Sequence, residues 1–173
     1  MATHLARILV LNTLLVSFAL AAAAQGTAGS TQASPAPSAT QARNRQVVES
    51  FFEALETQQF AKLRDIFAPD GRQVNAFVPA GFPKSFEGSE EIYKQYSGLT
   101  KLFGRLRFPR TIHTTEDPNY FFVEFKSDID MLAGGKYRND YIGTFRLRNG
   151  RVVEYTEYLN PLRLAEAFNI PLK

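Results

Sequence analysis

One carboxylate stands out among the residues that could do chemistry, because it falls on an apolar face. Between Arg151 and Asn160 the residues alternate, and the more apolar face carries Val153, Tyr155, Glu157 and Leu159. Burial raises the pKa of a carboxyl group, which would suit Glu157 to shuttling a proton as a catalytic residue. Two other interpretations stay open: a Glu157 paired with a neighbouring arginine, and a strand register that turns it toward water.

Polar side chains on the preceding stretch could bind a ligand beside that carboxylate. From Lys136 to Arg148 one face presents Tyr137, Asn139 and Tyr141 among apolar neighbours, while the opposite face looks solvated. In an aromatic-walled pocket, their hydroxyl and amide groups would hydrogen-bond a carbonyl or hydroxyl group of a substrate. Tyrosines that only fill a core, with their hydroxyls reaching solvent, are an equally common alternative.

Three further tyrosines are candidate substrate-binding residues. Tyr155 shares the face of Glu157, while Tyr93 and Tyr96 lie three residues apart in a predicted helix. Each of them could line a pocket or fill a core. We predict that they bind the substrate together with the polar side chains of residues 136–148.

The chain offers few ligands to a metal ion. It has no cysteine, which excludes disulfides, thiol nucleophiles and cysteine-ligated metal centres, and its only histidines are His4 and His113. His113 falls on an outward-facing strand face and is interpreted as a surface residue. Asp128 and Asp130 share a solvated face and lack the spacing of a calcium-binding loop. We therefore predict no metal and no organic cofactor.

Composition restricts the class of protein. Of the 173 residues, 45% are apolar and 21% charged, which is typical of a globular protein and excludes global disorder. Lysine and arginine number 20 against 17 aspartate and glutamate, a net charge of +3. The basic residues after the third predicted helix are interpreted as a solvated strand edge: Lys101, Arg105, Arg107 and Arg110. So slight an excess of positive charge predicts no nucleic-acid partner.

The N-terminal part of the chain is predicted to direct export. Residues 1–24 combine a positive charge at Arg7, an apolar run and the small residues Ala21–Ala24, as in a cleavable signal peptide. A retained transmembrane anchor is the alternative, but a bilayer span needs about 20 apolar residues. Residues 25–43, rich in Ala, Ser, Thr, Pro and Gly, predict a flexible linker. We expect a secreted or periplasmic protein with no stable membrane anchor after cleavage, whose single domain spans residues 44–173.

Periodicity predicts the elements that must position these residues. Helical spacing followed by a period of two predicts three helices, a meander of long strands and a short C-terminal helix. The predicted helices span 43–58, 60–67, 89–103 and 162–168, and the predicted strands span 73–78, 106–112, 121–131, 136–148 and 151–160. A turn at 68–71 and a loop rich in Gly and Pro at 79–84 flank the first strand. This order indicates the α+β class, a curved antiparallel β-sheet packed on about three helices with a concave face available as a cavity.

The same order, together with three motifs, resembles a known family. The motifs are Thr115-Glu116-Asp117-Pro118-Asn119, Tyr137-x-Asn139-x-Tyr141-Ile142, and Asn149-Gly150 leading to Glu157-Tyr158-x-Asn160-Pro161. With the tail at 164–171, they are similar to the cone-shaped nuclear transport factor 2-like, or SnoaL-like, domains. Within these domains the chain most resembles the phenazine-biosynthesis A/B (PhzA/PhzB) proteins. The resemblance covers residues 44–173 and implies a cone-shaped sheet.

The resemblance also implies a range of activities, since this scaffold hosts cyclases, isomerases, dehydratases and binding modules. In the phenazine family, a glutamate on the last strand works as acid and base, assisted by a histidine on the preceding long helix. Glu157 matches the glutamate, whereas Gln95 stands at the position of the histidine. We predict an exported, homodimeric domain that binds a small apolar or aromatic molecule of secondary metabolism. Two functions stay open: a cofactor-independent isomerase, cyclase or dehydratase using Glu157, and a non-catalytic ligand-binding or dimerisation module.

Overall fold

Residues 37–171, which a computed structural model describes, fold into one six-stranded sheet and four α-helices. The helices are α1 (Ala39–Glu56), α2 (Leu63–Ile66), α3 (Ser89–Gly98) and α4 (Pro161–Ala167), with 3-10 turns at Phe60–Lys62 and Leu99–Lys101. The strands are β1 (Phe67–Asn75), β2 (Ser85–Glu87), β3 (Arg110–Thr114), β4 (Tyr120–Asp130), β5 (Lys136–Arg148) and β6 (Arg151–Leu159). The predicted signal peptide at 1–24 and residues 25–36 of the predicted linker lie outside the described residues.

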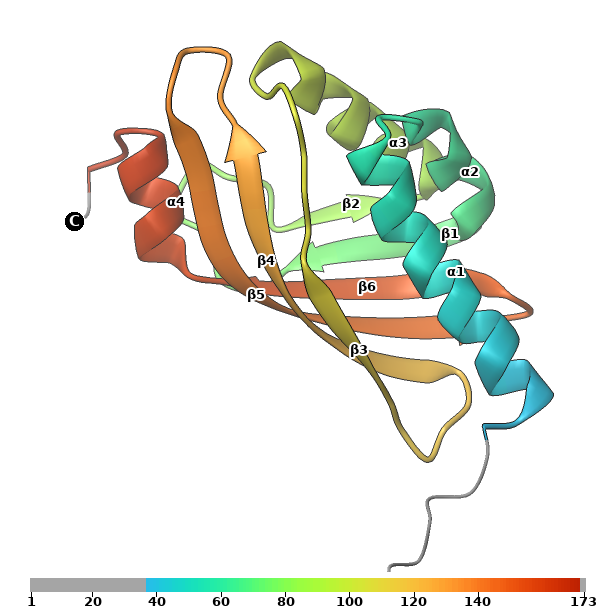
Figure 1. Cartoon of the computed structure of the whole chain (residues 1–173). Helices are drawn as coiled ribbons and strands as arrows, with labels where there is room; N and C mark the ends of the chain where they lie inside the picture. Colours follow the sequence, from blue (N-terminus) through green and yellow to red (C-terminus); the bar gives the residue numbers. More distant parts are fainter. Residues whose placement is uncertain (1–36, 172–173) are drawn as a thin grey trace, which may run out of the picture. The chain divides into compact units, whose positions relative to one another are not determined.

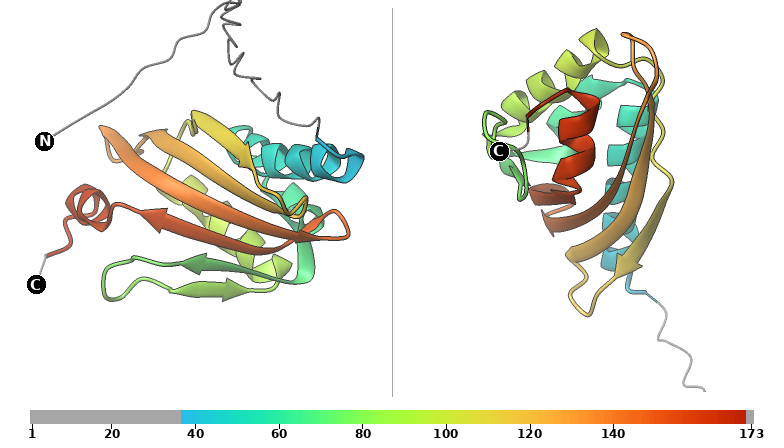
Figure 2. Two further views of the ribbon diagram at one scale, coloured as in Figure 1. Left: turned by 90° about the horizontal axis from the view of Figure 1, so that it is seen from below. Right: turned by 90° about the vertical axis from the view of Figure 1, so that its left-hand side faces the viewer.

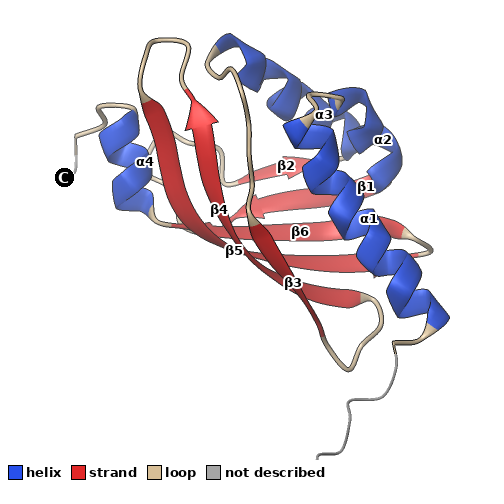
Figure 3. Ribbon diagram, in the orientation of Figure 1, coloured by secondary structure: helices blue, strands red, loops and turns tan. Residues whose placement is uncertain are grey.

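The sheet is mixed, with the spatial order β2-β1-β6-β5-β4-β3 (Figure 1). Strands β3 to β6 form the predicted antiparallel meander, and β2 is antiparallel to β1. Strand β1, however, runs parallel to β6, so the sheet is not wholly antiparallel as predicted. Parallel neighbours need a long crossover connection, and here α3 and the meander supply it. The α+β class, a curved sheet packed on helices, is confirmed (Figures 2 and 3).

Helix α1 begins at Ala39 rather than at the expected Arg43. Ser38 caps it, because the Ser38 hydroxyl oxygen accepts a hydrogen bond from the Gln41 backbone N–H at 3.1 Å. Its inner face buries apolar residues at helical spacing, including Val48, Phe51, Phe52 and Leu55. Like the other helices in the described part of the chain, α1 is not long and apolar enough to cross a bilayer.

Strand β1 contains the residues that were expected to form a turn. Residues 68–71 continue the strand, with a shift of register against β6 between Phe67 and Arg72. Gly71 allows this close passage, because a side chain there would lie 2.8 Å from the Val152 carbonyl oxygen. The strand ends at Asn75 rather than Val78, and the predicted loop after it is followed by the short strand β2.

Strand β6 also carries an irregularity, which decides which residues face inward. Its register against β5 shifts between Arg146 and Leu147, so Val152 is fully buried while Val153, expected on the inner face, is only half-buried. Beyond the shift the predicted alternation holds, and Tyr155 lies inside with no exposed surface. The position of Glu157 on the inner face is therefore the result of a regular strand that begins after the irregularity.

The core consists mainly of aromatic rings between α1 and the sheet. Phe51 is its centre, because its ring lies 5.0–6.0 Å from five other rings, most of them edge to face: Phe52, Phe67, Tyr96, Phe145 and Tyr155. Gly143 makes room for this packing, since a side chain there would meet the Tyr155 ring at 3.0 Å. The ring of Tyr155 is thereby fixed, and with it the hydroxyl that reaches into the site.

Candidate active site

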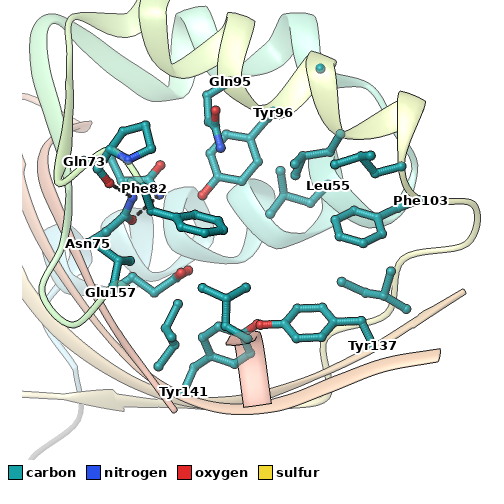
Figure 4. A pocket seen from close by; sticks show the side chains of 18 of the residues that line it. Leu55, Gln73, Asn75, Phe82, Gln95, Tyr96, Phe103, Tyr137, Tyr141 and Glu157 are labelled. Carbon is teal, nitrogen blue, oxygen red and sulfur yellow. Dashed lines mark hydrogen bonds between the residues drawn. The ribbon is translucent and has the colours of Figure 1, made fainter. Parts of the chain in front are cut away.

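A cavity of about 610 Å³ opens between the concave face of the sheet and helices α1, α3 and α4 (Figure 4). Its volume lies within the range of small-molecule binding sites. Most of its walls are aromatic or aliphatic, and they include Phe51, Phe52, Phe82, Phe103, Phe108, Phe125 and Phe168. Its polar groups are few and come from strands β1, β5 and β6 and from helix α3 (Figure 4).

Glu157 points into this cavity from β6 (Figure 4). The Tyr155 hydroxyl donates a hydrogen bond to its Oε2 atom at 2.7 Å. No arginine or lysine among residues 37–171 forms an ion pair with Glu157, which argues against the predicted alternative of a structural pair. The carboxyl group therefore faces the cavity with one fixed hydrogen bond and no balancing charge.

The environment of Glu157 determines its protonation. Enclosure by protein atoms raises its pKa from 4.5 to about 7, and the hydrogen bond from Tyr155 acts weakly in the opposite direction. The residue keeps some accessible surface because the cavity it faces admits solvent. Near neutral pH, both the acid and the carboxylate forms are consequently populated.

A second polar cluster lies on β5 and its neighbour β4. The Tyr137 oxygen accepts two hydrogen bonds, from Asn139 Nδ2 at 2.8 Å and from the Tyr141 hydroxyl at 2.9 Å. Ser127 Oγ lies 3.4 Å from the Tyr141 oxygen and accepts a bond from the Asn139 backbone N–H at 2.9 Å. Burial raises the pKa of Tyr137 and of Tyr141, so both remain hydroxyl donors.

Gln73 and Asn75, which the sequence analysis did not select, lie beside Glu157. The parallel pairing of β1 with β6 places Gln73 opposite Tyr155 and Asn75 opposite Glu157, and both residues line the cavity. Gln73 Nε2 donates to Asn75 Oδ1 at 3.1 Å, whereas Gln73 Oε1 is buried without a hydrogen-bond partner. Polar residues on a strand next to an apolar run were visible in the sequence, but their partner strand was not.

The predicted substrate-binding residues separate into two groups. Tyr96, Tyr137, Tyr141 and Tyr155 line the cavity together with Glu157, whereas Asn139 and Tyr93 do not. Asn139 is buried behind Tyr137, where its Nδ2 also donates to the Asn160 carbonyl oxygen at 3.0 Å.

Tyr93 lies on a part of α3 that does not reach the cavity. The Arg64 guanidinium carbon sits 3.4 Å from the centre of its ring, and the Arg64 side chain is also paired with Glu90. Tyr93 and Tyr96 are three residues apart, yet only Tyr96 points inward (Figure 4). The prediction that both bind substrate is therefore not supported for Tyr93.

The remaining candidates lie at the surface, with one exception. His113 is exposed, and its Nε2 lies 3.2 Å from Glu124 Oε2. Asp128 and Asp130 form ion pairs with basic side chains nearby, and no group of three potential metal ligands occurs among residues 37–171. Arg110 is the exception: its side chain is only 13% exposed, so its assignment to a solvated edge was wrong.

The C-terminal helix closes one side of the cavity. Asn160 caps α4, since its Oδ1 accepts from the Leu162 backbone N–H at 3.0 Å, and Pro161 occupies the first turn. The ring of Phe168 then lies 6.1–6.4 Å from three other rings of the cavity wall: Phe82, Phe103 and Tyr137. An aromatic contact thus joins the loop after β1, the loop after α3 and β5 around the opening.

Comparisons with known proteins agree with this geometry. Residues 48–155 match the SnoaL-like domain. A PhzA/B-like protein of Pseudomonas aeruginosa is 34% identical over 108 residues, which cover 60% of this chain and 74% of that protein. The phenazine biosynthesis protein PhzA2 of Pseudomonas aeruginosa is 30% identical over 133 residues, 74% of this chain and 82% of PhzA2.

Solved structures show the same fold. A Bacillus subtilis protein, provisionally described as an isomerase, superposes with a TM-score of 0.70 and 26% identity, covering 77% of this chain and 97% of its own. PhzB2 of Pseudomonas aeruginosa superposes with a TM-score of 0.68 and 22% identity, covering 78% of this chain and 85% of its own. The resemblance predicted from the motifs is confirmed, and the chain belongs to the SnoaL-like domain family, with the nuclear transport factor 2-like fold.

Proposed function

We propose that this protein is a cofactor-independent acid–base enzyme that isomerises, cyclises or dehydrates an uncharged apolar or aromatic small molecule. One observation carries the proposal: the Glu157 carboxyl group lies in an aromatic cavity, has a pKa raised to about 7, and accepts a hydrogen bond only from Tyr155. Perturbed carboxyl groups without a structural partner are typical of catalytic sites.

A pKa near the working pH lets one carboxyl group serve in both directions. The carboxylate form can take a proton from a carbon or hydroxyl group of the substrate, and the acid form can return it at another atom. Tyr155 orients the carboxyl group, because the Tyr155 ring is fixed in the core and its hydroxyl is bonded to Oε2. Gln95, at the position where the phenazine family has a histidine, lines the cavity with an amide that does not titrate. Proton transfer would therefore depend on Glu157.

The charges around the cavity favour an uncharged substrate. Lys94 and Lys101 line its rim, where Lys94 is exposed and paired with Glu91 at 2.8 Å. Glu157 is the one acidic residue in the lining, and no cation deep in the cavity would pair with an anionic substrate. An anion bound there would repel the carboxylate, so a neutral apolar or aromatic molecule fits the site best.

The comparisons support organic small-molecule chemistry without naming a substrate. Relatives named for phenazine biosynthesis and a structural neighbour provisionally described as an isomerase share the fold. Export through residues 1–24, in secondary metabolism, and homodimer formation through the outer face of the sheet belong to the same proposal. The outer face suits a two-fold contact, since it carries charges of both signs and the exposed rings of Phe122 and Tyr158.

The test is proton exchange on a probe ketone. 2-Tetralone is a neutral bicyclic ketone with acidic C–H groups beside its carbonyl, and their exchange in D₂O can be followed by proton NMR. The parent chain should accelerate this exchange, and Glu157→Gln should reduce the acceleration about 100-fold or more, the usual contribution of a positioned acid or base.

Glu154→Gln is the matched control, because Glu154 lies on the same strand, pairs with Arg72 and does not line the cavity. Exchange by Glu157→Gln equal to that of the parent would contradict the catalytic role. Binding of the probe without accelerated exchange would favour the non-catalytic binding module.

A further inference from the structure

Four tyrosine hydroxyl groups line the cavity, and they differ in what their protons do. Tyr96, Tyr137, Tyr141 and Tyr155 are each at most 8% exposed. Burial raises the pKa of every one of them, so all four are neutral hydroxyl groups near pH 7. Their value to a ligand depends on which of them already has a protein acceptor.

Two of the four donate within the protein. Tyr155 donates to Glu157 Oε2 at 2.7 Å, and Tyr141 donates to the Tyr137 oxygen at 2.9 Å. The Tyr137 oxygen is in turn held by both Asn139 and Tyr141. These three hydroxyl groups are therefore fixed by protein partners on β5 and β6.

The Tyr96 hydroxyl is different, because its proton has no acceptor among residues 37–171. The amide of Gln73 lies close enough to act on the Tyr96 oxygen, but Gln73 Oε1 has no hydrogen-bond partner and so does not receive the Tyr96 proton. Tyr96 is 7% exposed, and what remains exposed is turned into the cavity (Figure 4). A buried hydroxyl without an acceptor costs stability, which indicates that a ligand completes it.

The position of Tyr96 is also suited to the chemistry proposed for Glu157. It reaches down from α3 while Glu157 reaches up from β6, and both side chains end in the same part of the cavity (Figure 4). The negative charge of Glu157 is, after burial, the next contribution that keeps Tyr96 protonated, which means that the two groups lie near each other. Edge-to-face packing on Phe51, at 5.7 Å between ring centres, holds the Tyr96 ring in place.

We propose that the Tyr96 hydroxyl donates a hydrogen bond to a carbonyl oxygen of the substrate, next to the C–H bond from which Glu157 takes a proton. The substrate class is then an uncharged carbonyl compound with an acidic adjacent C–H group. In the step, the C–H bond breaks, its proton passes to the Glu157 carboxylate, and its electron pair delocalises onto the carbonyl oxygen, where Tyr96 stabilises the charge. Return of the proton to carbon restores the carbonyl, so no oxidant or reductant is needed. The inference rests on the proposed function for its chemistry, but the contact can be tested by binding alone.

The test compares two probes that differ by one oxygen. 2-Tetralone has a carbonyl group, and tetralin is the corresponding hydrocarbon; their dissociation constants are measured with the parent, Tyr96→Phe, Tyr137→Phe and Tyr93→Phe. The parent should bind the ketone about ten-fold more tightly than the hydrocarbon, the scale of one hydrogen bond in an apolar site. Tyr96→Phe should lose this preference and bind tetralin unchanged. Tyr93→Phe, outside the cavity, should change neither constant.

Stability separates a ligand-binding role from a structural one. Because its proton has no protein acceptor, loss of the Tyr96 hydroxyl should leave the melting temperature equal to or above that of the parent. A lowered melting temperature with an unchanged ketone preference would overturn the proposal, as would loss of the preference in Tyr137→Phe instead. Equal or undetectable binding of both probes by the parent would overturn it as well.

Proton exchange distinguishes this proposal from the proposed function. Ketone preference that depends on Tyr96, without accelerated exchange in D₂O, would retain the contact and refute the acid–base function. Exchange that depends on Glu157 but not on Tyr96 would retain the function and refute the contact.

Discussion

Two ionisable side chains of opposite charge are enclosed by this domain, and they are treated in opposite ways. Arg110 on β3 is paired with Glu49 at 2.8 Å and with Glu56 at 3.1 Å, and its guanidinium carbon lies 4.8 Å from the centre of the Phe52 ring. Glu157 on β6 has no cationic partner within the described residues and accepts one hydrogen bond from a neutral hydroxyl. The fold therefore neutralises one enclosed charge and leaves the other uncompensated.

The difference indicates which group stabilises the fold and which serves function. An enclosed charge with partners on α1 ties the strand to the helix, and its loss leaves those partners unpaired. An enclosed carboxyl group without a partner costs free energy whenever it is charged, and a protein retains such a group when its titration is useful. Arg110 and Glu157 thus predict opposite responses to removal of their charges.

Removal of the Arg110 charge should have the largest effect on stability. Arg110→Met keeps much of the side-chain volume but leaves Glu49 and Glu56 facing each other without a cation, so the free energy of unfolding should fall by about 3 kcal/mol. Chemical denaturation of the variant and the parent measures the change. Arg148→Met, which removes an exposed pair with Asp70, is the control and should change stability much less. Equal losses in both variants would remove the distinction between the two sites.

Removal of the Glu157 charge should have the opposite sign. The pKa of Glu157 is raised from 4.5 to about 7 in the folded protein, so the parent should lose stability as the pH rises from about 4.5 to 7. Glu157→Gln lacks this dependence and should be at least as stable as the parent, with an advantage of about 2–3 kcal/mol above pH 7. Denaturation of both proteins at pH 4.5 and pH 8 measures it. A destabilised Glu157→Gln at both pH values would mean that the carboxyl group braces the fold.

Removal of the one hydrogen bond to Glu157 should have the smallest effect. Tyr155→Phe keeps the buried ring but removes the donor that stabilises the carboxylate, so the pKa of Glu157 should rise further. The pH at which exchange of the probe ketone reaches half its maximum should move upward by about one pH unit. An unchanged or lowered midpoint would show that the Tyr155 hydrogen bond does not control the titration of Glu157.

The sequence was informative about the site wherever the signal was local. Alternation along β5 and β6 predicted that Tyr137, Tyr141 and Glu157 face inward, because successive residues of a strand point to opposite sides. The two residues misassigned on α3 and β6, Tyr93 and Val153, lie where the local pattern is ambiguous. A helical stripe three residues wide contains both Tyr93 and Tyr96, and only the docking of α3 on the sheet selects one. The irregularity at the start of β6 likewise depends on its pairing with β5.

By itself, the sequence determined the α+β class, the SnoaL-like family and the inward carboxylate, since periodicity, turn residues and motifs are properties of contiguous segments. Only the tertiary structure decided what surrounds that carboxylate. Gln73 and Asn75 lie beside Glu157 because β1 pairs parallel to β6, a contact between segments about half the chain apart. Arg110 is enclosed because α1 supplies Glu49 and Glu56. The hydroxyl of Tyr96 is left without an acceptor because α3 spans the cavity above the sheet. Burial and pairing arise from distant segments meeting, so the local pattern carries no record of them.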